Sequence, residues 1–225
     1  MYEQIQTVQT LWQGGTLTRK NSFGKDVVIQ TFPRPLQGRL PIWVTSSGSS
    51  DTFVQAGRIG ANVLTHMIGQ DSSALTKNIW RYRVARKENG FDPADGIVSL
   101  MLHTFIGKDP GVVKAKARQP FREYLRSAVL LENKAAQGGG AISGGHKVPH
   151  HTIPAAMMEE LLDITFDRYY SSAALLGTPE SCKPLVMQLR AIGVDEIACL
   201  IDFGIPEEDV LRGLDNLNDF RLMFI

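Results

Sequence analysis

A small, hydroxyl-rich turn is the strongest chemical signal in the sequence. It follows an apolar segment and runs Thr45-Ser46-Ser47-Gly48-Ser49-Ser50-Asp51, which indicates a strand end leading into a helix start. Free backbone N–H groups at a helix N-terminus favour an anion, and serine hydroxyls add donors without bulk. The turn therefore predicts an anion site that a phosphate would fit. The alternative is that Ser50 or Asp51 only caps the helix, because both residue types do this well.

Histidines occupy two other segments that have the character of strands. Thr65 and His66 end the segment ANVLTHM, and a solvated strand-end histidine is the alternative to a binding role there. His103 lies within LMLHTF, where the neighbouring residues are mostly apolar. A polar side chain in such a strand must find a partner or line a cavity. His103 is thus either a site residue or a buried structural histidine.

Three further histidines, His146, His150 and His151, lie in the glycine-rich segment QGGGAISGGHKVPHH. Imidazoles are common metal ligands, but no cysteine or acidic residue stands nearby at a recognisable spacing. We therefore expect no metal. The glycines break both helical and strand periodicity, which favours a mobile lid loop over residues 137–155.

The elements that position these residues begin with an amphipathic helix over residues 2–13, which Gly14 and Gly15 end. Residues 16–35 alternate polar and apolar side chains around Asn21 to Gly24, which predicts a hairpin excursion. No strand precedes the helix.

Apolar strands then alternate with helices through the rest of the chain. The expected strands cover residues 40–45, 61–67, 96–107 and 195–204. The helix from Asp109 to about Ala136 contains Pro120, and Pro184 conflicts with a helix start near Thr178. This alternation predicts an α/β fold with a parallel sheet, either doubly wound or closed as a (β/α)8 barrel. Four strands cannot close a barrel of eight.

Composition is that of a globular protein, with 225 residues, 43% of them hydrophobic and 21% charged. The net charge is +1, so nothing marks a nucleic-acid or membrane surface. Only two cysteines occur and the N-terminus lacks the pattern of a signal peptide, so we expect a cytoplasmic protein.

Three segments in order resemble one family. They are PIWVTSSGSSDTFVQAGRIGANVLTHMIGQ, LMLHTFIG and GTPESCKPLVMQLRAIGVDEIACLIDFG. They are similar to the flavin-dependent luciferase-like monooxygenases of natural-product gene clusters, and the resemblance covers nearly all of residues 2–213. It implies that the chain is a single partial domain, the C-terminal portion of a (β/α)8 TIM barrel. On that register the four strands are the fifth to eighth, and the fold is incomplete at the N-terminus.

The resemblance also implies an activity. Members use reduced flavin mononucleotide (FMN) and molecular oxygen to oxygenate an organic substrate. Residues 45–50 would then bind the flavin phosphate, Thr65 and His66 would lie near the flavin, and His103 would be the catalytic acid or hydrogen-bond donor. Expected partners are a small or carrier-tethered substrate, a separate flavin reductase, and nonribosomal peptide synthetase or polyketide synthase modules, with a homodimer left open.

Two alternatives to this function remain open in the sequence. One is an inactive half-barrel fragment whose strand edges are exposed. The other is a different phosphate-binding barrel enzyme, although no lysine lies at a strand end to form a Schiff base. We expect Thr178 to cap a helix that begins at Pro179. The Asp202 carboxylate could polarise a substrate or cap the last helix, and we expect the capping role.

Overall fold

A computed structural model describes residues 2–68, 70–137 and 155–225. By their contacts, the residues divide into two compact units, 1–43 and 44–225. Of the predicted lid loop at 137–155, residues 138–154 with the three histidines lie outside the described residues, and its two end residues belong to helices. The prediction of a single domain stays a prediction.

The first unit contains one helix and one hairpin, as predicted. Helix α1 spans Tyr2–Trp12, and strands β1 (Leu17–Lys20) and β2 (Asp26–Ile29) pair antiparallel. The Asn21 side chain closes the turn, because its Oδ1 accepts from the backbone N–H groups of Phe23 and Lys25 at 2.9 and 3.0 Å. This Asx-type turn lies at the position predicted for the hairpin, between Asn21 and Gly24.

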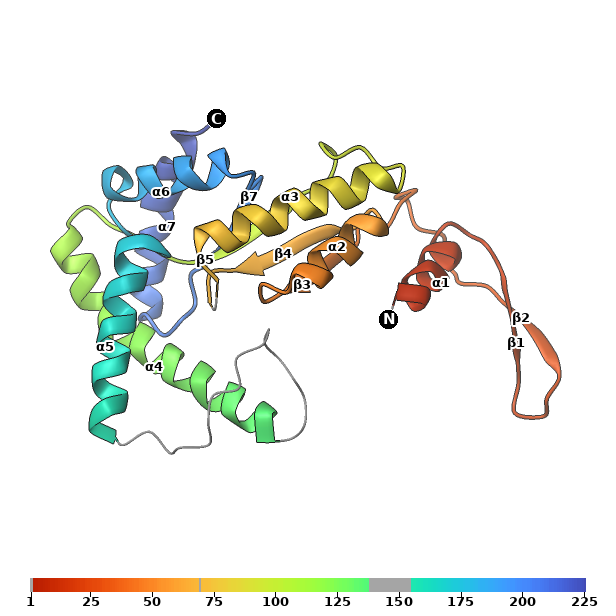
Figure 1. The fold of residues 1–225 in the computed structure, drawn as a ribbon, viewed down its shortest axis with the longest axis horizontal. Helices are drawn as coiled ribbons and strands as arrows, with labels where there is room; N and C mark the ends of the chain where they lie inside the picture. The colour runs from red at the N-terminus through yellow and green to blue at the C-terminus, as the bar shows by residue number, and fades with distance from the viewer. Residues whose placement is uncertain (1, 69, 138–154) are drawn as a thin grey trace. The chain divides into compact units, whose positions relative to one another are not determined.

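The second unit is built on one open sheet of five strands (Figure 1). The strands are β3 (Trp43–Ser46), β4 (Asn62–His66), β5 (Val98–Ile106), β6 (Leu175–Gly177) and β7 (Glu196–Leu200). The order is β3-β4-β5-β6, and β7 also pairs with β5. Strand β5 runs parallel to β4, β6 and β7. Among the described residues the sheet does not close, and no residue of β7 is buried.

Helices join the strands and cover the sheet. Between β3, β4 and β5 run α2 (Ser50–Arg58) and α3 (Ser72–Glu88), which lie along the strands in Figure 1. Their contact is close: a Cβ added to Gly57 would lie 2.5 Å from the Tyr82 carbonyl oxygen. The Tyr82 hydroxyl donates to the Ala61 carbonyl at 2.8 Å, so α3 is tied to the start of β4.

Beyond β5 the chain forms α4 (Pro110–Gln137) and α5 (Ala155–Ser172), then α6 (Pro179–Ala191) and α7 (Glu207–Leu222). Both α4 and α6 continue through an internal proline, Pro120 and Pro184. Each of the four predicted strands is present with shifted ends, and β6 is an additional one. None of the helices in the described parts of the chain is long and apolar enough to span a bilayer.

The strand register divides the side chains between the two faces of the sheet. His66 lies opposite Met101 in the β4–β5 pair, and His103 lies two residues further along β5. Since side chains alternate along a strand, His66, Met101 and His103 share one face. Val63, Thr65 and Leu100 share the other face and are buried. The two predicted site histidines therefore lie on the same side of the sheet. An incomplete barrel with strands flanked by helices is confirmed.

Candidate functional site

The predicted site residues gather at the carboxyl ends of the strands. Because β4, β5 and β7 are parallel, His66, Ile106 and Leu200 end at one edge of the sheet. The turn after β3 leads from Ser46 into α2. In α/β proteins this edge is where ligands bind.

Helix α2 begins at the turn after β3 without a side-chain cap on its first N–H groups. Gly48 has φ +102°, a conformation that favours glycine. The N-cap residue is Ser49, and it makes no side-chain capping hydrogen bond. The Ser46 hydroxyl instead donates to the Ser49 carbonyl at 3.3 Å. The alternative in which Ser50 or Asp51 caps α2 is therefore wrong, and no capping side chain competes for the N–H groups of the first turn.

Helix α3 contributes a positive charge to this turn that the sequence analysis missed. The guanidinium of Arg81 donates to the Ser50 hydroxyl at the start of α2. The Asn78 amide donates to the Gly48 carbonyl at 3.0 Å and is buried. A cation beside the positive end of a helix dipole strengthens attraction for an anion. Arg81 is 31 residues from Ser50 in the chain, so no local sequence pattern links them.

Thr65 lies beneath the turn and ties β4 to β3. Its side chain is 1% exposed, and its hydroxyl donates to the Ser46 carbonyl at 2.8 Å. The same hydroxyl accepts from Gln70 Nε2 at 2.8 Å, and Nε2 also donates to the His66 carbonyl at 2.6 Å. The Thr65 hydroxyl hydrogen is thus already engaged in a hydrogen bond within the protein. Its predicted contact with a cofactor stays a prediction.

The other half of the Gln70 amide is unsatisfied. Its Oε1 is buried and has no hydrogen-bond partner among the described residues. A Cβ on Gly48 would lie 3.4 Å from this oxygen, so the glycine lets the amide approach the turn. A buried acceptor without a donor costs free energy and is often satisfied by a ligand or water. Gln70 is a further candidate site residue, and only its place after a strand end could have pointed to it.

His66, at the end of β4, is half-buried. Its Nδ1 accepts from the Ile68 backbone N–H at 3.1 Å. The neutral ring therefore carries its proton on Nε2. The structure leaves the predicted cofactor contact of His66 untested.

His103 is enclosed by aromatic rings. It is 2% exposed and lies edge-on to Phe121, Tyr124 and Phe203, with centroid distances of 4.6, 4.5 and 5.5 Å. Its Nε2 is buried and has no hydrogen-bond partner in the described structure. Burial, with a smaller contribution from the charge of nearby His66, lowers the pKa of His103 to about 4. The ring is therefore neutral at neutral pH, and α4 covers it.

A groove of about 480 Å³ lies beside this cluster, between α4 and the residues that follow β7. Two rings that contact His103, Tyr124 and Phe203, also line the groove, together with Asp202. The predicted capping role of Asp202 is wrong, because the N-cap of α7 is Pro206 and no side chain caps that helix. Asp202 lies four residues before the N-cap residue Pro206, and it lines the groove instead.

The remaining predictions concern α6 and metal binding. Thr178 and Ser181 form a capping box, with Ser181 N–H to Thr178 Oγ1 at 3.3 Å and Thr178 N–H to Ser181 Oγ at 2.9 Å. The cap at Thr178 and the first helical position of Pro179 are confirmed. Pro184 does not delay the helix, which begins at Pro179. The residues that the structure describes contain no cluster of side chains that could hold a metal ion.

Comparisons with known proteins agree with this arrangement of strands and helices. Among solved structures, monooxygenase RslO1 from Streptomyces bottropensis has a TM-score of 0.65 at 18% identity, over 98% of this chain and 59% of that chain. The oxygenating constituent of 3,6-diketocamphane monooxygenase from Pseudomonas putida, in complex with FMN, gives 0.63 at 14% identity, over 96% and 60%. An F420-dependent secondary alcohol dehydrogenase gives 0.64 at 15% identity, over 97% and 59%. The chain thus spans about 60% of the length of these structures.

At such low identity these structures show the fold alone. A search of the curated proteins found no match. The family model of the luciferase-like monooxygenases matches residues 1–196, which is most of the chain. The chain belongs to the luciferase-like monooxygenase family.

Proposed function

We propose that this chain provides the flavin-phosphate site of a monooxygenase that uses reduced FMN and molecular oxygen on an organic substrate. The observation that carries the proposal is the start of α2, where no side chain caps the helix and Arg81 adds a positive charge. A flavin phosphate would accept hydrogen bonds from the backbone N–H groups there, as anions do at other helix N-termini. Because the chain spans about 60% of the solved structures it resembles, the activity of the whole protein is part of this proposal.

The chain offers polar groups of the types that could hydrogen-bond to a flavin. The buried Gln70 Oε1 needs a donor, which a cofactor hydroxyl or ring N–H would supply. His103 holds a neutral ring in a dry, aromatic environment, so it can donate one hydrogen bond and accept another without carrying charge. Bound reduced flavin would supply the electrons that activate oxygen. The protein would orient the substrate and exclude water.

The source of reduced flavin and the substrate belong to the same proposal. The sequence carries no pyridine-nucleotide motif, which supports a separate reductase as the source of electrons. A small or carrier-tethered substrate from natural-product biosynthesis follows from the family resemblance. The groove beside Tyr124, Phe203 and Asp202 is large enough for part of such a molecule.

A second candidate is an oxidoreductase that uses coenzyme F420. Two structures of similar fold support it, the alcohol dehydrogenase above and an F420-dependent tetrahydromethanopterin reductase from Methanopyrus kandleri. Parallel titrations with FMN and with F420 separate the two, because the proposal predicts tighter binding of FMN.

The test of the phosphate site is the FMN affinity of an Arg81→Met variant, measured by equilibrium fluorescence titration. Loss of a charge-assisted contact typically costs about 1.5–3 kcal/mol, which is roughly a 10- to 150-fold weaker Kd. Arg58→Met, at the exposed C-terminal end of the same helix α2, is the matched control and should change affinity little. Equal affinities for wild type and Arg81→Met would refute the site.

A further inference from the structure

Helices α4 and α5 share a four-residue repeat of opposite charge. On α4 an apolar residue is followed by a basic one at 113–114, 117–118, 121–122 and 125–126. On α5 an apolar residue is followed by an acidic one at 158–159, 162–163 and 166–167. Residues four apart lie on one face of a helix, so each helix carries an apolar column beside a charged column.

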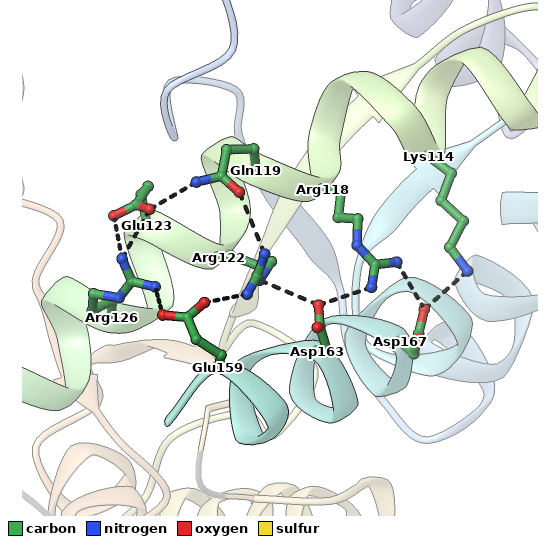
Figure 2. Close-up of polar contacts among 9 residues, drawn as sticks. All are labelled: Lys114, Arg118, Gln119, Arg122, Glu123, Arg126, Glu159, Asp163 and Asp167. Carbon is green, nitrogen blue, oxygen red and sulfur yellow. Dashed lines mark hydrogen bonds and ion pairs between the residues drawn. The ribbon is translucent and has the colours of Figure 1, made fainter. Parts of the chain in front are cut away.

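The charged columns meet as an ion-pair ladder, shown in Figure 2. It consists of Lys114, Arg118, Arg122 and Arg126 on α4 with Glu159, Asp163 and Asp167 on α5. The distances are 2.9 Å for Lys114–Asp167, 2.8 Å for Arg118–Asp163, 2.5 Å for Arg122–Glu159 and 2.6 Å for Arg126–Glu159.

Arg122 is the central rung of the ladder. Its side chain is 15% exposed, less than that of any other ladder residue. It pairs with Glu159 through Nη2, and its buried Nε lies 3.3 Å from Asp163 Oδ1. Exposed ion pairs contribute little, typically about 0–1 kcal/mol, whereas a half-buried pair is less screened by solvent. Most of the ladder's orienting effect therefore falls on Arg122.

The residue beside Arg122 connects the ladder to His103. Phe121 contacts the His103 ring at 4.6 Å and two α5 rings, Phe166 at 6.0 Å and Tyr169 at 5.4 Å. Its side chain is completely buried. A change in the rotation of α4 against α5 would thus move the ring that covers His103.

We propose that Arg122 is a positioning residue, which holds α4 against α5 so that Phe121 and Tyr124 keep water away from His103. The site it serves is the one proposed above, but its effect on His103 can be measured without flavin or substrate. A failure here would leave the FMN titration of Arg81→Met unaffected, so the two proposals fail separately.

Burial and one charged group, His66, are the causes that set the pKa of His103 among the described residues, so its titration reports on hydration. His66 lies on β4 and lowers the pKa of His103 through its charge, and Tyr124 on α4 is the titratable neighbour in ring contact. Phe203 covers the ring from the segment after β7, next to Asp202 on the groove. The main cause of the low pKa is burial. Entry of water should therefore raise it.

The experiment is an NMR pH titration of His103 in the full 225-residue chain and its variants. Arg122→Met keeps the apolar stem but removes the charge, and the pKa of His103 should rise from about 4 toward the 6.5 of a solvated histidine. Arg122→Lys should retain a low value because it keeps a cation in the ladder. Lys116→Met is the matched control: Lys116 is also on α4 but pairs with Asp209 of α7.

A second variant separates hydration from a direct effect of charge. The double change Glu159→Gln with Asp163→Asn removes two negative charges, which by Coulomb's law alone would lower the pKa of a histidine. The proposal predicts the opposite, a rise, because the ladder loses its acidic side. An unchanged or lower His103 pKa in this folded double variant would overturn the proposal, as would a rise in Lys116→Met equal to that in Arg122→Met.

Discussion

Burial of a neutral histidine should make the stability of this protein depend on pH in a defined window. Burial lowers the pKa of His103 to about 4, against 6.5 for a solvated histidine. Between these values the unfolded chain binds a proton that the folded chain does not. The free energy of unfolding should therefore fall as the pH falls from about 6.5 to about 4, with no further contribution from His103 below that.

The size of this effect follows from the shift itself. A difference of roughly 2.5 between the two pKa values, at 1.36 kcal/mol for each, corresponds to about 3 kcal/mol. This is an upper figure, because a protonated ring can draw in water. It is still a large share of the total free energy of unfolding, which is about 5–15 kcal/mol for most native proteins.

The measurement compares urea unfolding of wild type and His103→Gln at pH 7 and pH 4. Carboxylates also titrate in this range, but they do so in both proteins, so the difference between the two isolates His103. We expect wild type to lose about 3 kcal/mol more than His103→Gln between the two pH values. Equal losses would show that His103 is hydrated in the folded state, and the enclosing aromatic cluster would then be incorrect.

Two further predictions concern packing and the opposite end of the sheet. Gly57→Ala should destabilise the chain by about 1–3 kcal/mol in urea unfolding, because its Cβ would lie 2.5 Å from the Tyr82 carbonyl; Gly38→Ala, in open space, is the control and should have little effect. Asp195→Ala should cost about 1–2 kcal/mol, since Asp195 Oδ2 accepts from the Val98 N–H at 2.7 Å, and a cost near zero would contradict this.

Much of the fold could be predicted from the sequence because its signals are local. Alternation identified the β1–β2 hairpin, and apolar runs bounded by turns identified β3, β4, β5 and β7. Strand β6 was not predicted because it has only three residues, Leu175–Gly177, which is too short for a periodic pattern. It is defined by its pairing with β5. Strand ends shifted by one to four residues, as is usual where pairing rather than periodicity sets the boundary.

The site was predicted less completely, because its residues meet only in the folded chain. The turn after β3 was found from its serines, but Arg81 and Gln70 come from other segments. His103 was recognised as a polar residue in an apolar strand, yet the rings that enclose it come from α4 and from the segment after β7. The repeat of apolar and charged pairs on α4 and α5 was visible in the sequence. Its significance required the pairing of the two helices.

An NMR titration of the labelled chain with FMN tests whether the start of α2 binds the flavin phosphate. We expect the largest backbone amide shifts at residues 48–52, where α2 begins without a side-chain cap. Riboflavin, which lacks the phosphate, should leave these amides nearly unshifted. Shifts at residues 48–52 that are equal for FMN and riboflavin, or absent for FMN, would contradict the claim.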